Sequence, residues 1–179
     1  MQNPEAPGWY NPARMRILFV CSGNICRSPL AEALFVHAAR EAGLEDQFEV
    51  DSAGTHDFHA GDRADPRTIQ VGARHGVDVT SIARKVRGSD FDRFDLILGM
   101  DRGHLRELRS LAPGRDRDKI ELMRTYDEPG ADPDVADPYY GGLEGFERMY
   151  QVLLRCTANL LTSLQARLAQ PAVQGAEPA

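Results

Sequence analysis

Continuous apolar runs alternate along the chain with segments whose apolar residues recur at helical spacing. Runs of the first kind are typical of buried parallel strands and occur at residues 15–20, 48–52, 94–100 and 120–123. Segments of the second kind predict helices from 29 to about 42, from 66 to about 75, from 101 to about 111, and over 143–168. Strands that alternate with helices predict an α/β fold with a parallel sheet covered on both faces.

Short polar residues, proline and glycine mark where these helices begin and end. Asp65-Pro66 has the pattern of an N-cap followed by proline, and Ser28-Pro29 predicts the same start for the first helix. Gly43 and Gly76 follow the predicted helix ends. Residues 125–142 form a Pro/Gly/Asp-rich loop, and irregular loops of this length are often functional lids.

Composition favours one soluble domain. The chain has 179 residues, with 42% hydrophobic and 27% charged residues, and we expect a folded domain over 15–168 between flexible segments 1–14 and 169–179. Its net charge of −6 argues against nucleic-acid binding, and it has no apolar stretch long enough for a membrane span. Residues 1–14 lack the apolar core of a signal peptide, and three cysteines make a poor disulfide framework. We therefore expect a cytoplasmic, reducing location.

The segment between the first strand and the first helix carries the clearest chemistry. Cys21 and Arg27 stand five residues apart, and Gly23 and Asn24 between them tolerate positive φ, so the loop can curl and point its N–H groups inward. Such a concavity at a helix N-terminus binds oxyanions, and Arg27 can grip two phosphoryl oxygens. The pattern predicts a phosphate-binding loop made of Ser22, Gly23, Asn24, Ile25, Cys26 and Arg27.

Cys21 is then the candidate nucleophile. The loop amides, Arg27 and the Ser28 hydroxyl would stabilise its thiolate, which could attack phosphorus. A cysteine after a buried strand is otherwise most often a small core residue. The strand before it, Gly-Asn within the loop and Ser-Pro after it favour the phosphate loop.

Residues 20–34, VCSGNICRSPLAEAL, resemble the signature of the low-molecular-weight protein tyrosine phosphatases. Further blocks follow in the family's order: VDSAGT at 50–55, RHGV at 74–77, DF at 90–91, FDLIL at 94–98, MD at 100–101 and DPYYG at 137–141. The resemblance spans residues 15–168. It implies a flavodoxin-like three-layer sandwich whose four-stranded parallel sheet has the order 2-1-3-4. It also implies a phosphatase that acts on phosphotyrosine proteins or peptides through a phospho-cysteine, with no metal or organic cofactor. We further expect a monomer.

A general acid for the leaving oxygen should lie in the late loop. Two Asp-Pro pairs compete there, Asp132-Pro133 and Asp137-Pro138, and the residues alone leave both open. The family pattern D-P-Y-Y selects Asp137, which would protonate the leaving phenol and then activate water. Asp132 is better explained as a turn residue.

The resemblance also implies supporting residues. Asn24, Ser28, Ser52 and His75 would hold the loop by hydrogen bonds, although His75 alone would be interpreted as a helix-end histidine. The predicted substrate walls are Ile25, Phe58, Tyr139 and Tyr140. Phe58 stands where many members carry Trp. Ile25 stands where members that act on phospho-arginine carry Thr, which favours an aromatic ester here. Asp101 matches an acidic residue of the family's site and is equally well explained as an N-cap.

The sequence raises four further interpretations. In the family, the pair that matches Cys21 and Cys26 can form a protective reversible disulfide, whereas Cys26 could also be a buried thiol; Cys156 is predicted to be core. His56 and His59 are too loosely spaced to predict a metal. An arsenate reductase would need further thiols, and residues 75–105 contain none. A silent phosphate-binding module would have lost Cys21 or Asp137, and both are present.

Overall fold

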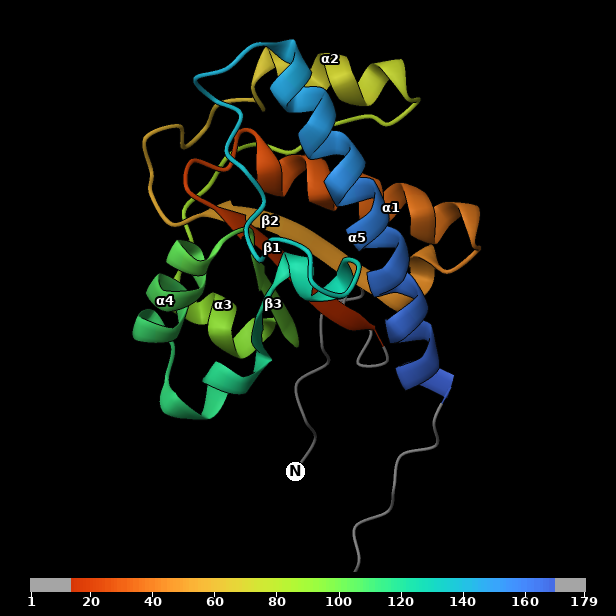
Figure 1. Ribbon diagram of the computed structural model, residues 1–179. Helices are drawn as coiled ribbons and strands as arrows, with labels where there is room; N and C mark the ends of the chain where they lie inside the picture. Colours follow the sequence, from red (N-terminus) through yellow and green to blue (C-terminus); the bar gives the residue numbers. More distant parts are fainter. Residues whose placement is uncertain (1–13, 170–179) are drawn as a thin grey trace, which may run out of the picture.

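Four parallel strands form the centre of the fold, in the order β2-β1-β3-β4 (Figure 1). The computed structural model describes residues 14–169, so the expected flexible segments lie outside the described residues except for Arg14 and Ala169. The strands are β1 (Met15–Cys21), β2 (Phe48–Gly54), β3 (Leu96–Gly99) and β4 (Ile120–Leu122). The predicted strand order is confirmed.

Within residues 14–169, five α-helices connect and cover these strands. They are α1 (Arg27–Glu41), α2 (Pro66–Arg74), α3 (Gly88–Arg93), α4 (Arg102–Leu111) and α5 (Leu143–Ala169). Short 3₁₀ turns occur at Glu45–Gln47, Gly114–Lys119 and Met123–Tyr126. The predicted N-caps Asp65 and Asp101 are confirmed, because each carboxylate accepts a backbone N–H of the first helical turn.

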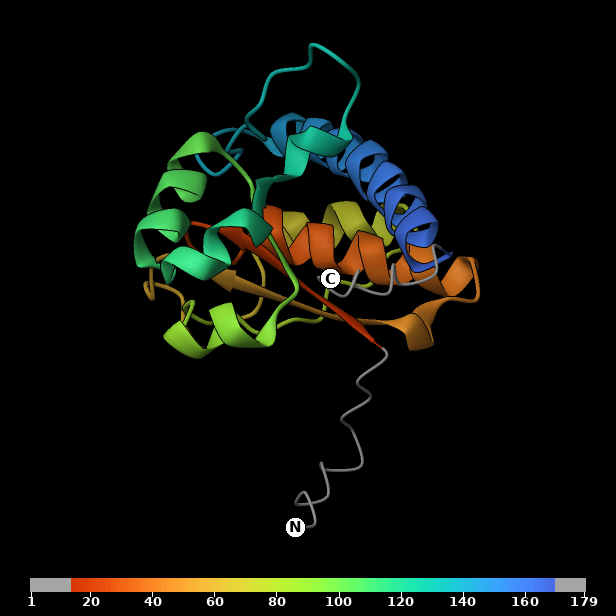
Figure 2. The ribbon, with the colours of Figure 1, turned by 90° about the horizontal axis from the view of Figure 1, so that it is seen from below.

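Both faces of the sheet are buried, which explains why its strands are continuously apolar. Ile17 and Phe19 of β1 pack into a core with α1, α2 and α5, whereas Leu18 and Val20 point to the other face, where α3 and α4 pack. Figure 2 shows α1 and α5 above β1 and β2, with α3 below them. The architecture is the three-layer sandwich that the alternating pattern predicts.

Helix α3 and the bounds of β3 differ most from the prediction. Helix α3 was not expected, because its six residues are too few to show a period; Asp90 stabilises its start by accepting the backbone N–H of Arg87 at 2.8 Å. Strand β3 starts two residues later and ends one residue earlier than the apolar run. Phe94 and Met100 are buried but lie outside the strand, so an apolar run alone overestimates its length.

The carboxyl ends of β1 and β3 define the position of the site. β1 pairs with β2 on one side and with β3 on the other. The chain first adds β2 on one side of β1 and then crosses to add β3 and β4 on the other side, so the direction of strand addition switches at β1. Ligands of open α/β sheets bind at such a switch point. Cys21 ends β1, and Asp101 caps α4 directly after β3.

Candidate active site

The loop between β1 and α1 curls through one residue in the left-handed region. Asn24 has φ 56° and is the only non-glycine residue with positive φ in the described part of the chain. Gly23 was also expected there and is not. Glycine is instead favoured there by close approach, because a Cβ at Gly23 would lie 3.1 Å from Cδ2 of the His59 side chain.

The loop turns its carbonyl groups outward. Cys21 O and Ser22 O accept the N–H groups of Thr55 and His56 at 2.9 and 3.0 Å, and Ile25 O accepts that of Asp65 at 2.8 Å. Within residues 14–169, the N–H groups of 23–26 have no hydrogen-bond acceptor. The result is a ring of free donors at the N-terminus of α1, as the phosphate-loop interpretation requires.

Ser28 contacts the candidate nucleophile rather than capping the helix. Cys26 occupies the N-cap position, so the predicted capping role of Ser28 is wrong. The Ser28 hydroxyl lies inside the first turn, 3.1 Å from Sγ of Cys21, and accepts Nδ2–H of Asn24 at 2.8 Å. A hydroxyl in this place can donate to a thiolate.

Asn24 is held by a buried network that extends to the back of the loop. Its Nδ2 also donates to Ser52 Oγ at 2.9 Å, and its Oδ1 accepts the N–H of Arg84 at 2.9 Å. Ser52 in turn donates to Glu32, whose pKa is raised by burial. Asn24, Ser28 and Ser52 thus lie together as expected. Glu32 and Arg84 were missed, because only long-range contacts place them here.

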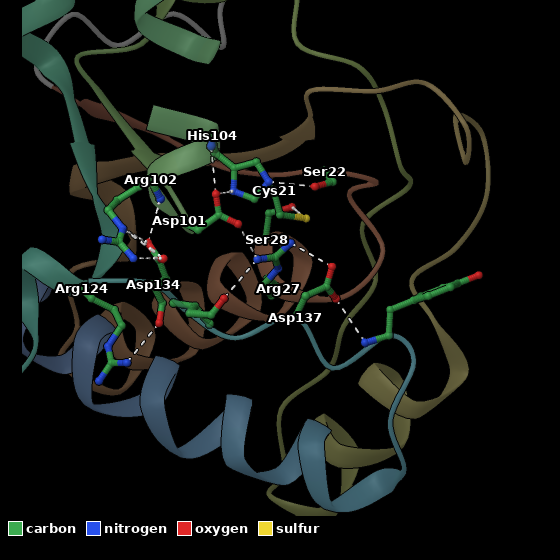
Figure 3. A network of polar contacts seen from close by, with 12 residues as sticks. Cys21, Ser22, Arg27, Ser28, Asp101, Arg102, His104, Arg124, Asp134 and Asp137 are labelled. Atoms are coloured by element: carbon green, nitrogen blue, oxygen red, sulfur yellow. Dashed lines mark hydrogen bonds and ion pairs between the residues drawn. The ribbon is translucent and has the colours of Figure 1, made fainter. Parts of the chain in front are cut away.

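Arg27 is buried beneath the loop, with 3% of its surface exposed. Its Nη1 donates to Asp101 Oδ2 at 2.9 Å and to Val135 O at 3.0 Å, and its Nη2 donates to Asp137 Oδ2 at 3.1 Å (Figure 3). The Nε–H and one Nη2–H have no partner among the described residues, so they remain available for phosphoryl oxygens.

The two candidate acids have different surroundings. Asp137 lies beside Arg27 and accepts the N–H of Tyr139 at 3.1 Å, with about half of its side chain exposed. Asp132 accepts the N–H of Asp134 at 2.9 Å in a turn. The structure therefore brings Asp137, and not Asp132, to the loop.

Asp101 is both an N-cap and a member of the site. Burial on its own would raise the pKa of this carboxyl, but the backbone N–H of His104 and the nearby charge of Arg27 outweigh burial and lower it. Asp101 is therefore a carboxylate that holds the guanidinium of Arg27 from the side of α4.

A cavity of about 290 Å³ opens over the loop. It is lined by residues 21–23 and 25–27, Phe58, His59, Asp137, Tyr139 and Tyr140. Tyr139 is 38% exposed, whereas Phe58 and Tyr140 are 80% and 97% exposed. Ile25 and Tyr139 thus form inner walls, and Phe58 and Tyr140 stand at the mouth.

His75 does not contact the loop, contrary to expectation. Its Nε2 lies 2.6 Å from Glu147 Oε1, and its ring stacks on Tyr150 with 3.9 Å between centroids. Because His75 caps the end of α2, its side chain reaches α5 instead. The helix-end interpretation is the better one.

The other two cysteines are thiols in buried surroundings. Burial, with the Asp65 carboxylate adding to it, raises the pKa of Cys26 to about 12. Burial likewise raises the pKa of Cys156 to about 12, and this residue is core, as predicted. The three cysteines are free.

His104 is a further residue that the sequence analysis missed. It lies in the first turn of α4 with its Nε2 2.8 Å from Ser22 Oγ. Neither its spacing from the loop nor its helix pattern could have indicated this contact.

Within the described residues, no three His, Cys, Asp or Glu side chains are grouped as a metal site would require. Residues 14–169 also contain no helix with the length and apolar character needed to cross a bilayer.

Comparisons with known proteins agree with this geometry. The sequence model of the family described as low molecular weight phosphotyrosine protein phosphatase matches residues 16–170. A low molecular weight protein-tyrosine-phosphatase of Streptomyces coelicolor is 47% identical over 156 residues, which cover 86% of this chain and 95% of the relative. The phosphotyrosine phosphatase of Schizosaccharomyces pombe is 44% identical, over 84% and 97%. A crystal structure of protein tyrosine phosphatase from Entamoeba histolytica, with Hepes in the active site, superimposes with a TM-score of 0.83 at 40% identity, over 86% and 98%.

Proposed function

The chain belongs to the low molecular weight phosphotyrosine protein phosphatase family, and we propose that Cys21, Arg27 and Asp137 carry out its chemistry. It is a protein-tyrosine phosphatase, a hydrolase of aryl phosphate monoesters that works through a phospho-cysteine. One observation carries the assignment of roles. Cys21 lies at the base of a ring of free N–H groups, with Arg27 and Asp137 paired at 3.1 Å beside it.

In the first step the phosphoryl group moves from substrate to sulfur. The phosphate dianion binds the free loop amides and the open N–H groups of Arg27. It competes with Asp137 for the guanidinium and favours the protonated carboxyl. The Cys21 thiolate forms the S–P bond while the P–O bond to the aryl group breaks, and Asp137 gives its proton to the leaving oxygen.

In the second step water releases the enzyme. Asp137, now a carboxylate, removes a proton from water as the water oxygen bonds to phosphorus and the S–P bond breaks. Inorganic phosphate leaves, and the Cys21 thiolate is regenerated with Ser28 Oγ 3.1 Å from its sulfur. Atoms and charges balance without a cofactor.

The substrates are phosphoproteins, and we propose that the phosphorylated residue is tyrosine. The aromatic and apolar walls of the 290 Å³ cavity suit a flat phenyl ring, which reaches the loop from the mouth past Tyr139. Ile25 at the inner wall offers no polar group to a guanidinium, which supports an aryl ester over phospho-arginine.

Four further expectations belong to the same proposal. A nucleophilic thiol needs a reducing compartment, which supports action in the cytoplasm. We expect a monomer, and the net charge of −6 supports no role for nucleic acid. Cys26 would form a reversible disulfide with an oxidised Cys21, and its buried thiol, whose pKa burial raises to about 12, would otherwise stay protonated at neutral pH.

Side-by-side kinetics on phosphotyrosine, phosphoserine and phospho-arginine forms of one peptide test this function. Burial of the phenyl ring should favour phosphotyrosine by about 50-fold in kcat/KM.

Cys21→Ser should lose turnover of all three, by about 10⁴-fold or more. Cys156→Ser is the matched control and should keep wild-type turnover, because a helical hydroxyl there can bond a preceding carbonyl, as Thr157 does with Leu153. Preference for phosphoserine would refute the substrate, and full turnover by Cys21→Ser would refute the nucleophile.

A further inference from the structure

We propose that His104 is a positioning residue for the phosphatase reaction, which clamps the phosphate loop to the first turn of α4. It would hold Ser22, next to the nucleophile, and Asp101, the partner of Arg27. Both ends of the loop are then fixed to one rigid element. This inference rests on the proposed function and adds to it a device that sets the shape of the phosphate cradle.

The contacts form a continuous chain from one end of the loop to the other. Nε2 of His104 lies 2.8 Å from Ser22 Oγ, and Nδ1 lies 3.1 Å from Asp101 Oδ1. Asp101 Oδ2 accepts Nη1–H of Arg27 at 2.9 Å. In Figure 3 the dashed contacts run from Ser22 to His104, from His104 to Asp101, and from Asp101 to Arg27. His104 therefore links two groups that both serve the same loop, because its ring contacts Ser22 and its backbone N–H donates to Asp101 Oδ1 at 2.9 Å.

The charges around the ring select its tautomer. Nδ1 faces the Asp101 carboxylate, although off the line of a proper hydrogen bond, so a proton is favoured on Nδ1. Nε2 is then free to accept the Ser22 O–H. Burial, with the nearby positive charge of Arg27, outweighs the carboxylates of Asp101, Glu107 and Asp137 and lowers the pKa of His104 to about 4. The imidazole is thus neutral at physiological pH.

Fixing Ser22 fixes the direction of the loop amides. Its carbonyl already accepts the N–H of His56 at 3.0 Å, and His104 holds its hydroxyl. With both groups held, the following peptide N–H is aimed into the cradle before substrate arrives. Such preorganisation lowers the reorganisation needed when a dianion binds.

The first turn of α4, which carries His104, packs closely against the end of β3. A Cβ at Gly99, the end of β3, would lie 3.3 Å from Cβ of His104 and 3.3 Å from the backbone N of Leu105. The first turn of α4 therefore rests directly on the strand that neighbours β1. His104 is 4% exposed, so water competes little for its hydrogen bond.

A buried histidine could instead serve only to fill the core, and a double-mutant cycle separates the two roles. The variants are Ser22→Ala, His104→Leu and the double variant, with kcat/KM for p-nitrophenyl phosphate and inhibition by inorganic phosphate as readouts. Each single variant should lower kcat/KM and weaken phosphate inhibition by about 10-fold. The double variant should also lose about 10-fold rather than about 100-fold, because both changes remove one interaction.

Two controls make this cycle specific. Ser110→Ala, on the exposed face of α4, should keep wild-type kinetics. His104→Gln, whose carbonyl can accept from Ser22, should restore activity to within about 3-fold of wild type. Losses that multiply in the double variant, or unchanged phosphate inhibition in Ser22→Ala, would overturn the proposal.

Nitrogen NMR of His104 gives an independent readout that a packing role would not produce. At a pH of about 6 the ring should be neutral with its proton on Nδ1. A proton on Nε2, or an imidazolium, would contradict the clamp. A wild-type enzyme that fails to hydrolyse p-nitrophenyl phosphate would instead refute the proposed function, so the two failures are distinguishable.

Discussion

Asp137 is held at the mouth of the cavity by two different neighbours. One carboxylate oxygen accepts from Arg27 at 3.1 Å and the other from the backbone of Tyr139 at 3.1 Å. In the proposed mechanism the dianion takes over the guanidinium, and the contact with Tyr139 would keep the carboxyl beside the aryl oxygen. A single side chain can therefore act first as acid and then as base.

Replacing Asp137 by Asn keeps the shape of the side chain and removes its proton. We expect kcat for phenyl phosphate to fall by about 10³-fold. The loss should be about 10-fold for p-nitrophenyl phosphate, because that phenolate leaves without protonation. The measurement is the ratio of the two kcat values in wild type and variant.

Asp132→Asn is the matched control, since Asp132 precedes a proline in the same loop and lies in a turn. It should stay within about 2-fold of wild type on both esters. Equal losses on the two esters in Asp137→Asn would show that Asp137 is not the acid, and a larger loss in Asp132→Asn would reassign the role.

Local roles of single residues could be predicted from the sequence, and distant ones could not. Cys21, Asn24 and Arg27 lie within one short loop, so their spacing was sufficient to predict that they lie together. The Asp-Pro pairs left two candidate acids, and the resemblance to a family was needed to choose. His75 was assigned to the loop and contacts α5 instead, because its direction depends on where α2 meets α5. His104 reaches Ser22 across 82 positions in the chain.

At the scale of elements, the start of α2 connects the phosphate loop to the substrate wall. The N–H of Asp65 donates to Ile25 O at 2.8 Å, and the Asp65 carboxylate accepts from Arg67 at 2.8 Å. Arg67 donates to Gly141 O at 3.0 Å and lies 5.8 Å from the centroid of the Tyr139 ring. Helix α2 therefore holds the Tyr139 wall over the cradle.

Arg67→Ala should loosen this wall and leave the chemistry intact. We expect KM for a phosphotyrosine peptide to rise by about 5-fold, with kcat within about 2-fold of wild type. Arg74→Ala, at the exposed far end of the same helix, is the control and should change neither constant. A fall in kcat with unchanged KM would show that Arg67 acts on the loop rather than on the wall.

The type and order of the helices and strands along the chain could be predicted from the sequence. Which strands lie next to each other in the sheet could not. Apolar runs revealed all four strands, because burial on both faces removes the polar positions. Asp-Pro and glycine located the ends of α2. Helix α3 was missed because it has only six residues. The spatial order of the strands came from the family resemblance, because the pattern of apolar residues along one strand does not show which strands pair with it.

At the scale of the whole molecule, the sheet gathers segments that are far apart in the chain. β1 ends at Cys21, β3 leads into Asp101 and His104, and the late loop returns Asp137 to the same edge. Two cores, one on each face, support this edge from above and below. The site therefore depends on the parallel arrangement of the strands, because only that arrangement places these three segments together.

Above all, we propose that the sulfur of Cys21 receives the phosphoryl group. Rapid quenching of the Asp137→Asn variant during turnover of p-nitrophenyl phosphate should trap this intermediate, because the base that speeds its hydrolysis is missing. Mass spectrometry of the digested protein should then find the phosphoryl group on the peptide that contains Cys21. A phosphoryl group on another side chain, or steady turnover with none on the protein, would contradict the account.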